Sequence, residues 1–367
     1  MQVDSPEMRH VDREDSSRSD QTLTGRRIAF VTTAPAPYRD MLYRHLTDLG
    51  ASVRVYYTRA ATRDRRWAVD DSVSSERLAR VVAVSRFGQF HRGLLRVVRS
   101  ADVVVVGGYH TLTYVVAMLL GRATGRRVVM FFDGVAPSRL GRRGVGELCK
   151  RALVRLPHHV LANGTVGRRY MVEHLRVPSQ RVFNQYLVPV PMPRLESHEP
   201  EFDAVFVGRL LPRKRADLVV AAAQLEPTMR WCIVGDGPES SALRAADVDG
   251  RVTFLGELAR PEVAGVIGRS RSVVMPSEDE PWGLVVQESL EMGRPVVVSV
   301  DAGCAADLIR DGENGVVLRE LTPQALLDGV RRALGLADQP AMARANSEIL
   351  STWTRLHYCQ AFARAVG

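Results

Sequence analysis

Residues 272–298 have the sequence SVVMPSEDEPWGLVVQESLEMGRPVVV, which contains one complete strand–helix–strand unit. Its first four residues form a short apolar run that predicts a buried strand, and residues 284–292 predict a helix. A second apolar run, 296–298, follows Gly293 and Pro295, which are typical of the end of a helix. Two strands joined through a helix run parallel in one sheet. The unit therefore predicts an α/β fold with a parallel sheet.

The same alternation extends along the chain on both sides of this unit. Further apolar strand runs occur at 26–33, 52–58, 103–106, 127–132, 159–162, 203–207, 231–234, 252–255 and 315–318. Between the two halves, residues 188–193 (VPVPMP) carry three prolines, which exclude a helix or a central strand. The sequence thus predicts two doubly wound α/β domains, residues 26–190 and 200–350, with a ligand cleft between the carboxyl ends of their sheets.

Composition bounds the class of protein. Of 367 residues, 46% are hydrophobic and 25% charged, which excludes collagen-like, coiled-coil and wholly disordered chains. No apolar run approaches the roughly 18–20 residues of a membrane-spanning helix. Residues 1–25 contain six acidic side chains and predict a disordered polar tail, not a signal peptide. The four widely spaced cysteines predict reduced, buried thiols in a cytoplasmic protein; they are Cys149, Cys232, Cys304 and Cys359.

The most specific chemistry lies in the acidic loop 276–283, between a strand and a helix. The amino terminus of a helix offers free N–H groups and a partial positive charge, which suit an anion. Glu280 stands just before the helix, and Glu288 lies one turn inside it on the same face as Leu284. One carboxylate can bind a sugar and the other a ribose, while phosphates meet the helix end. The alternative is an acidic terminus that only complements the helix dipole.

Two glutamates separated by seven residues, in a P-S-x-x-E-x-x-G-L frame, resemble the signature of the retaining family 4 glycosyltransferases, the group 1 enzymes of GT-B fold. Six segments follow that family's pattern in the same order. Besides the acidic loop with its helix, they are residues 206–214, 234–238, 252–256, 293–303 and 311–315. The resemblance covers most of residues 203–318. It implies that residues 351–367 form a helix that crosses back to the first domain.

In this family the arginine and lysine of a G-R-x4-K run clamp the donor diphosphate, and Arg209 and Lys214 occupy those positions. The chemistry is consistent, because negative charge that develops on the leaving diphosphate must be stabilised. Lys214 is also one of only two lysines, with Lys150. The alternative is a solvated basic run at a helix start, where cations oppose the helix dipole.

The resemblance further implies that Glu280 binds sugar hydroxyls and Glu288 binds the ribose. The other implied donor-binding positions are Gly208, Gly235, Gly256, Leu258, Gly283 and Leu284. Pro281 and Trp282 depart from the family's glycine–aromatic pair, which leaves the sugar open. The family generally needs no metal, and no histidine lies near the acidic loop, so neither a metal nor a cofactor is expected. The Gly235-x-Gly237 pair lacks the rest of an NAD fingerprint.

The first domain matches the family more loosely. The turn that begins with Ala34 resembles a subgroup with a P-x-P-Y-R turn and a later R-x-W at residues 65–67. Many members of the family carry a histidine near His110 and another after the next strand, where this chain has Asp133. The resemblance therefore implies that His110 and Asp133, both at strand ends, are candidate catalytic residues, although His110 could instead cap the helix that follows. Pro35, Arg39 and Asn163 are expected on the acceptor side of the cleft.

Charge divides the chain. Residues 26–194 carry 29 basic and 10 acidic side chains, and residues 195–367 carry 18 and 25. A positive domain attracts polyanions. Residues 86–99, and the basic region 139–155, could lie on an anionic membrane; alternatively, both are ordinary helices packed on the sheet. No nucleic-acid-binding module is recognisable, so nucleic acid is not an expected partner.

Taken together, the sequence predicts a retaining glycosyltransferase that moves a sugar from a nucleotide-diphosphate donor to an acceptor hydroxyl. The acceptor is a glycan, a lipid-linked or a small molecule, and the expected role is polysaccharide or lipid-linked glycan assembly, in the cytoplasm or at the inner face of the membrane. Alternatives are the tailoring of a secondary metabolite, a GT-B epimerase or hydrolase, and a non-catalytic binding protein.

Overall fold

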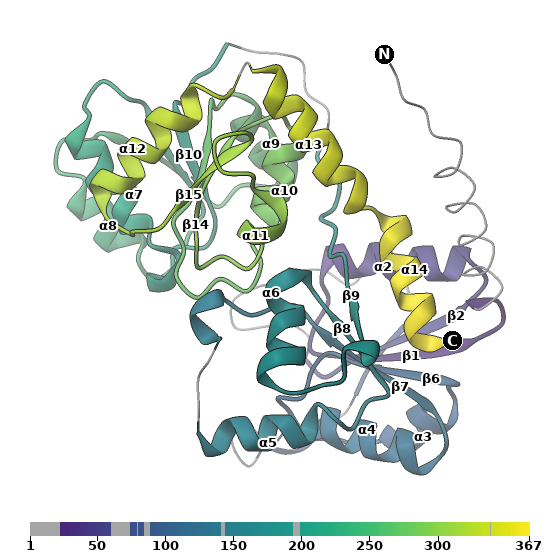
Figure 1. Ribbon diagram of the computed structural model, residues 1–367. Helices are drawn as coiled ribbons and strands as arrows, with labels where there is room; N and C mark the ends of the chain where they lie inside the picture. The colour runs from purple at the N-terminus through teal and green to yellow at the C-terminus, as the bar shows by residue number, and fades with distance from the viewer. Residues whose placement is uncertain are drawn as a thin grey trace, which may run out of the picture.

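The computed structural model describes residues 23–59, 74–78, 80–83, 89–140, 144–193, 199–337 and 339–367 (Figure 1). Two parallel sheets, each covered by helices on both faces, form two α/β units. This confirms the predicted fold class. The predicted tail, except its last three residues, and the R-x-W segment 65–67 lie outside the described residues. Leu23 is fully buried.

The first sheet has seven strands in the order β3-β2-β1-β6-β7-β8-β9. Their bounds are β1 Arg27–Thr32, β2 Ser52–Tyr57, β3 Ser75–Arg77, β6 Val103–Val106, β7 Arg127–Phe132, β8 His159–Ala162 and β9 Val182–Asn184. Helices cover both faces, so the central strands are continuous apolar runs; all four valines of β6 are buried.

One face of this sheet packs against α3 (Leu94–Arg99), α4 (Leu112–Ala123) and α6 (Gly164–Arg169). The π-helical turn η2 (Tyr170–His174) continues α6. Helix α5 (Val145–Leu153) comes earlier in the chain, between β7 and β8. The opposite face packs against α2 (Pro37–Asp48) and the last helix, α14 (Arg355–Val366).

The second sheet has six strands in the order β12-β11-β10-β13-β14-β15. Their bounds are β10 Ala204–Val207, β11 Trp231–Val234, β12 Val252–Gly256, β13 Val273–Met275, β14 Val296–Ser299 and β15 Gly315–Leu318. One face packs against α7 (Ala216–Leu225), α8 (Ser240–Ala246) and α12 (Pro323–Leu334). The other packs against α9 (Arg260–Gly268), α10 (Leu284–Glu291), α11 (Ala305–Leu308) and α13 (Pro340–Thr352).

The chain crosses between the two units twice. The first crossing is the proline-rich segment 185–193, which has no regular secondary structure. The second leads from α13 into α14, and Figure 1 shows these two yellow helices running from one unit to the other. Phe362 of α14 packs on Phe30 of the first sheet, with ring centroids 5.8 Å apart. The end of the chain therefore contributes to the core of the first unit.

The single helix expected over 86–99 is wrong. In the described part of that segment, β5 (Gln89–His91) pairs with β4 (Arg80–Ala83) as an antiparallel hairpin, and α3 follows only after it. Gly93 precedes α3 with a left-handed φ of 85°, which interrupts any continuous helix. Leu94 and Val97 of α3 are buried, so its apolar side packs on the sheet.

Two smaller predictions also need correction. The helix expected to start at the basic run begins only at Ala216, because residues Pro212–Lys214 form a 3-10 turn and Arg215 is left-handed with φ 55°. The delayed start keeps Arg213 and Lys214 out of the first helical turn, where cations are unfavourable. Among the cysteines, Cys149 is exposed and the other three are buried.

Candidate active site

The loops after β10 and β11 touch each other through their backbones. A β-carbon on Gly235 would lie under 3.0 Å from the carbonyl oxygen of Gly208, and one on Gly237 would also lie under 3.0 Å from that of Leu210. Gly235 also has φ 130°, and its N–H donates to the Gly256 carbonyl at 2.7 Å. Only glycine permits this approach. The predicted donor-binding glycines of three neighbouring strands thus lie at one edge of the sheet, and Arg209 follows β10 there, half-buried.

The acidic loop brings Glu280 to Lys214, 66 residues away in the sequence. The Lys214 ammonium contacts Glu280 Oε2, and Arg213 Nη1 lies 3.3 Å from the same oxygen. The Glu280 side chain is only 9% exposed. A carboxylate this deeply buried requires nearby cations. The structure therefore joins two of the predicted donor-binding residues and adds Arg213, which the sequence showed only as part of a basic run.

Glu288 lies on α10 and is also buried. Its Oε1 is 2.7 Å from Nη1 of Arg260, whose other terminal nitrogen donates to the carbonyl of Val190 in the first crossing. No pattern in the sequence relates Arg260 to Glu288, because the pair forms only when α9 and α10 pack side by side. Gly283, with φ 103°, allows the turn into α10.

Leu258 and Leu284, the remaining predicted donor-side residues, are half-buried against the apolar cluster beneath this sheet edge.

On the first unit, Asp133 follows β7 and forms an ion pair with Arg39 of α2. Gln185 donates to the second carboxylate oxygen of Asp133 at 3.2 Å. Arg39 is 6% exposed, and Asp133 offsets the cost of burying its positive charge. Two predicted acceptor-domain residues, 94 positions apart, are thus brought together. Pro35 is buried in the turn before α2.

Asn163 is 1% exposed, and its carboxamide oxygen accepts from the Leu187 N–H at 3.0 Å. This bond ties Asn163 to the first crossing, whereas its buried Nδ2 makes no hydrogen bond among the described residues.

His110 lies on the exposed turn before α4. The cap of α4 is Thr111, whose hydroxyl accepts from the Tyr114 N–H at 3.3 Å, so the alternative in which His110 caps this helix is wrong. The His110 ring instead packs edge-on against Tyr114, with centroids 5.2 Å apart. Partial loss of hydration lowers the pKa of His110 from the ordinary 6.5; the Asp133 carboxylate opposes this shift, and Arg59 and Arg39 reinforce it.

This pKa has a testable consequence. Because the pKa of His110 is lower in the folded chain than in the unfolded chain, protonation favours unfolding, and stability falls as the pH drops through 6.5. If the neutral ring takes part in the reaction, kcat/KM will fall on acidification with a midpoint below pH 6.5. We expect His110→Gln to flatten this acid limb, measured between pH 5 and 8. A midpoint above 6.5, or an unchanged limb in the variant, would contradict the role.

Both units hold the acidic loop in place. A β-carbon on Gly134, after β7, would lie 2.5 Å from the Pro281 carbonyl oxygen. The Asp301 carboxylate accepts from the backbone N–H of Ser138 at 2.6 Å and from that of Asp279 at 2.6 Å. The loop bearing Glu280 is therefore fixed between the two sheets, through contacts that the sequence did not predict.

Two further pairs join the units. Arg139 forms an ion pair with Asp279. Thr165 donates its N–H and its hydroxyl to Asp307, at 2.9 and 2.6 Å. Burial raises the pKa of Asp307, and the Thr165 hydrogen bonds reduce the rise.

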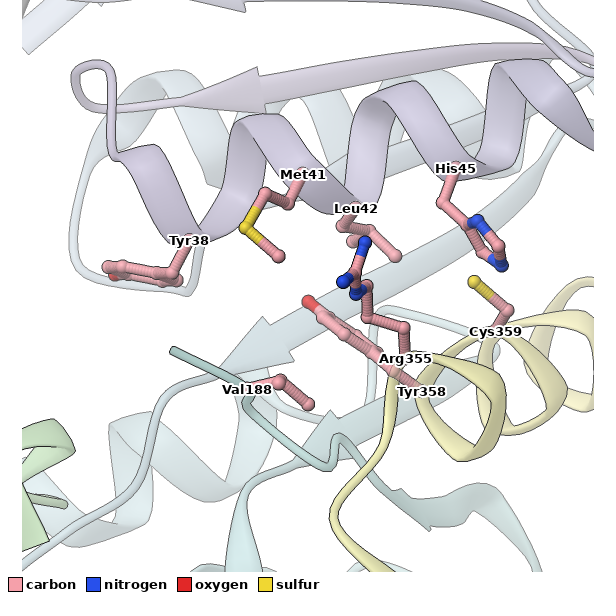
Figure 2. A pocket seen from close by; sticks show the side chains of 8 residues that line it. All are labelled: Tyr38, Met41, Leu42, His45, Val188, Arg355, Tyr358 and Cys359. Carbon is pink, nitrogen blue, oxygen red and sulfur yellow. The ribbon is translucent and has the colours of Figure 1, made fainter. Parts of the chain in front are cut away.

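A separate small pocket lies between α2, Val188 and α14 (Figure 2). It contains none of the predicted site residues. In the described part of the chain, no group of three or more histidine, cysteine or acidic side chains is arranged to hold a metal. None of the described helices is long and apolar enough to cross a membrane.

Comparison with known proteins gives a family match for the second unit. Residues 192–349 match the family model described as glycosyl transferases group 1. The D-inositol 3-phosphate glycosyltransferase of Mycobacterium marinum is 32% identical over 162 residues, which are 41% of this chain and 34% of that protein. The protein of the same name from Mycobacterium leprae is 34% identical over 152 residues, 39% and 35% of the two chains. The chain spans about a third of the length of the curated relatives it matches.

Solved structures match nearly the whole chain. HepE of Anabaena in complex with UDP has a TM-score of 0.67 at 16% identity and covers 92% of this chain and 98% of its own. Sucrose-phosphate synthase from Thermosynechococcus elongatus has a TM-score of 0.67 at 15% identity, over 91% and 96%. At these identities the likeness concerns the fold. The chain therefore has the GT-B fold, and its residues 192–349 match the group 1 glycosyltransferases.

Proposed function

We propose that the protein is a retaining glycosyltransferase that moves a sugar from a nucleotide-diphosphate donor to an acceptor hydroxyl. The observation that carries this proposal is the meeting of Lys214, Arg213 and Glu280 at the edge of the second sheet. Cations there suit a diphosphate, and the carboxylate suits sugar hydroxyls. HepE was crystallised with UDP and with UDP-glucose, which supports a uridine nucleotide as the first donor to test.

In the proposed reaction the bond between the anomeric carbon and the donor diphosphate breaks while the acceptor oxygen forms its bond on the same face. The leaving diphosphate takes the acceptor proton, so no enzyme nucleophile is needed. Arg209 and Lys214 stabilise the leaving charge. Glu288 holds the ribose in this scheme. Because the two cations take the role of a metal, we expect activity to persist in EDTA.

We assign the acceptor to the side of the cleft that carries Asp133, Arg39 and His110. Polysaccharide or lipid-linked glycan assembly is the proposed role. A second candidate is a small phosphorylated acceptor, favoured by two observations. The first unit is strongly basic, and the relatives at 30–34% identity are named for an inositol phosphate.

The transfer assay combines UDP-glucose with candidate acceptors and measures the release of UDP together with the new glycoside. Proton NMR then reports the anomeric configuration, and retention is expected. An inverted product would contradict the mechanism. UDP release that is independent of every acceptor would favour a hydrolase, and a changed sugar on UDP would favour an epimerase.

We also propose that the first unit docks on anionic membrane at the cytoplasmic face. Exposed leucines, among them Leu95, Leu119 and Leu148, lie on α3, α4 and α5, which run along one side of this unit in Figure 1. The exposed arginines Arg96 and Arg99 accompany them on α3. Apolar side chains flanked by cations suit an anionic lipid surface.

Flotation tests this docking. We expect the protein to float with phosphatidylglycerol vesicles and not with phosphatidylcholine ones. Leu148→Glu should reduce the bound fraction, because it places a negative charge next to the anionic lipid and removes apolar area from the protein surface. Leu225→Glu, at an exposed leucine of the second unit, is the matched control. Equal binding to both vesicle types would contradict the proposal.

A further inference from the structure

The indole ring of Trp282 lies between the two units. Trp282 follows Glu280 by two positions in the acidic loop and is 4% exposed. A β-carbon on Gly164, at the start of α6 in the first unit, would lie under 3.0 Å from Cζ3 of this indole. The six-membered half of the ring therefore abuts the backbone of the opposite unit.

The other side of Trp282 faces the two segments by which the chain crosses between the units. Its ring packs on Trp353, with centroids 4.7 Å apart and the planes tilted by 36°. Trp353 belongs to the second crossing, between α13 and α14. It also packs on Tyr186 of the first crossing, at 5.4 Å and 65°. Three aromatic rings thus connect the acidic loop with both crossings. Any movement between the units must change the conformation of these two crossings.

The first crossing is held in an unusual conformation. Tyr186 has φ 49°, in the left-handed region that large side chains rarely adopt. A residue in this region is strained and keeps its conformation only where its surroundings hold it. The T-shaped packing on Trp353 supplies part of that support. The conformation of the first crossing at Tyr186 and the position of Trp353 therefore depend on each other.

A tryptophan is also a costly choice for simple packing at this position. Its indole N–H is buried, and among the described residues it makes no hydrogen bond. A buried donor without a partner is unfavourable, and a phenylalanine would avoid that cost. What the phenylalanine lacks is the second ring, the part that reaches Gly164.

We propose that Trp282 is a positioning residue that couples the loop of Glu280 to the arrangement of the two units. The loop takes its present geometry only when Gly164 and Trp353 enclose the indole. Donor binding and the relative position of the units then share one equilibrium. The inference rests on the proposed function, because it takes Glu280 as a donor ligand.

A double-mutant cycle separates this coupling from ordinary packing. Gly164→Ala presses a methyl group on the indole, and Trp282→Phe removes the ring that it meets. Alanine at Gly164 is also strained by its φ of 68° and crowded by Asp307 Oδ2 at 2.7 Å, but both effects occur in either background and cancel in the cycle. The variants are Gly164→Ala, Trp282→Phe and the pair.

The first readout is the radius of gyration of the free protein by small-angle X-ray scattering, and the second is the KM for UDP-glucose alongside kcat. We expect Gly164→Ala to increase the radius of gyration and raise KM. In the double variant KM should be roughly tenfold lower than in Gly164→Ala, and the radius of gyration should return most of the way to the wild-type value. Effects that simply add would overturn the proposal.

Trp231→Phe is the control, because Trp231 is a buried tryptophan of β11 in the core on the other face of the second sheet. It should lower the melting temperature without rescuing Gly164→Ala. A rescue by Trp231→Phe would overturn the proposal. If wild type binds no nucleotide, the proposed function fails, while the scattering cycle still decides the coupling.

Discussion

Replacement of Lys214 by alanine is expected to lower kcat by about 10²–10³-fold, the usual loss when one group that stabilises a developing charge is removed. The Lys214 ammonium lies in the buried cluster with Glu280, where water screens little. Arg213 remains 3.3 Å from the same carboxylate, so Glu280 keeps a cation and the fold should survive. The measurement is the steady-state rate of UDP release with acceptor, together with the melting temperature.

The control is Lys150→Ala, which removes the only other lysine. Lys150 lies on α5 and pairs with Glu147 at 2.5 Å, away from the second sheet. This variant should keep the wild-type kcat. A loss below tenfold in Lys214→Ala, or an equal loss in both variants, would contradict the assignment of Lys214 to the leaving group.

Gly235→Ala is expected to abolish donor binding. The new β-carbon would fall under 3.0 Å from the Gly208 carbonyl oxygen, so the loops after β10 and β11 must separate. The atoms in conflict are backbone atoms, which cannot rotate away as a side chain can. Affinity for UDP should fall below detection by calorimetry, while the circular dichroism spectrum stays close to wild type because both sheets remain.

Gly250→Ala provides the matched control. Gly250 also has a positive φ, 63°, but nothing lies within 4 Å of its would-be β-carbon. The Gly250→Ala variant therefore suffers only the strain of the positive φ, about 1–2 kcal/mol, and no steric clash. We expect lower stability with unchanged UDP affinity. If Gly235→Ala behaves like Gly250→Ala, the close approach of the two loops is not required for binding.

The fold could be predicted because parallel strands covered on both faces leave strong local signals. The four valines of β6 and the run WCIV of β11 are continuous apolar segments, and each is followed by glycine and a helix. Local signals gave the wrong secondary structure where tertiary contacts determine it. Residues 86–99 have helical spacing of apolar side chains, yet the described part divides into β5 and α3 at Gly93.

The site was predictable only in part, for the same reason. Glu280 and Glu288 stand in one local motif, so their proximity to the helix start follows from spacing. The partners do not. Arg260 meets Glu288 across two helices, and Trp353 reaches Trp282 through the return of the chain. Pairs so distant in sequence are specified by the packing of whole elements, which periodicity does not encode.

If the edge of the second sheet binds a nucleoside diphosphate, thermal unfolding with UDP, GDP, ADP and TDP will show it. A ligand at 100 times its Kd adds about 2.7 kcal/mol of stability. We expect a clear rise in melting temperature with one of the four, strongly reduced in Glu288→Ala and in Lys214→Ala. No shift with any of them, or a shift that both variants retain in full, would contradict binding at this edge.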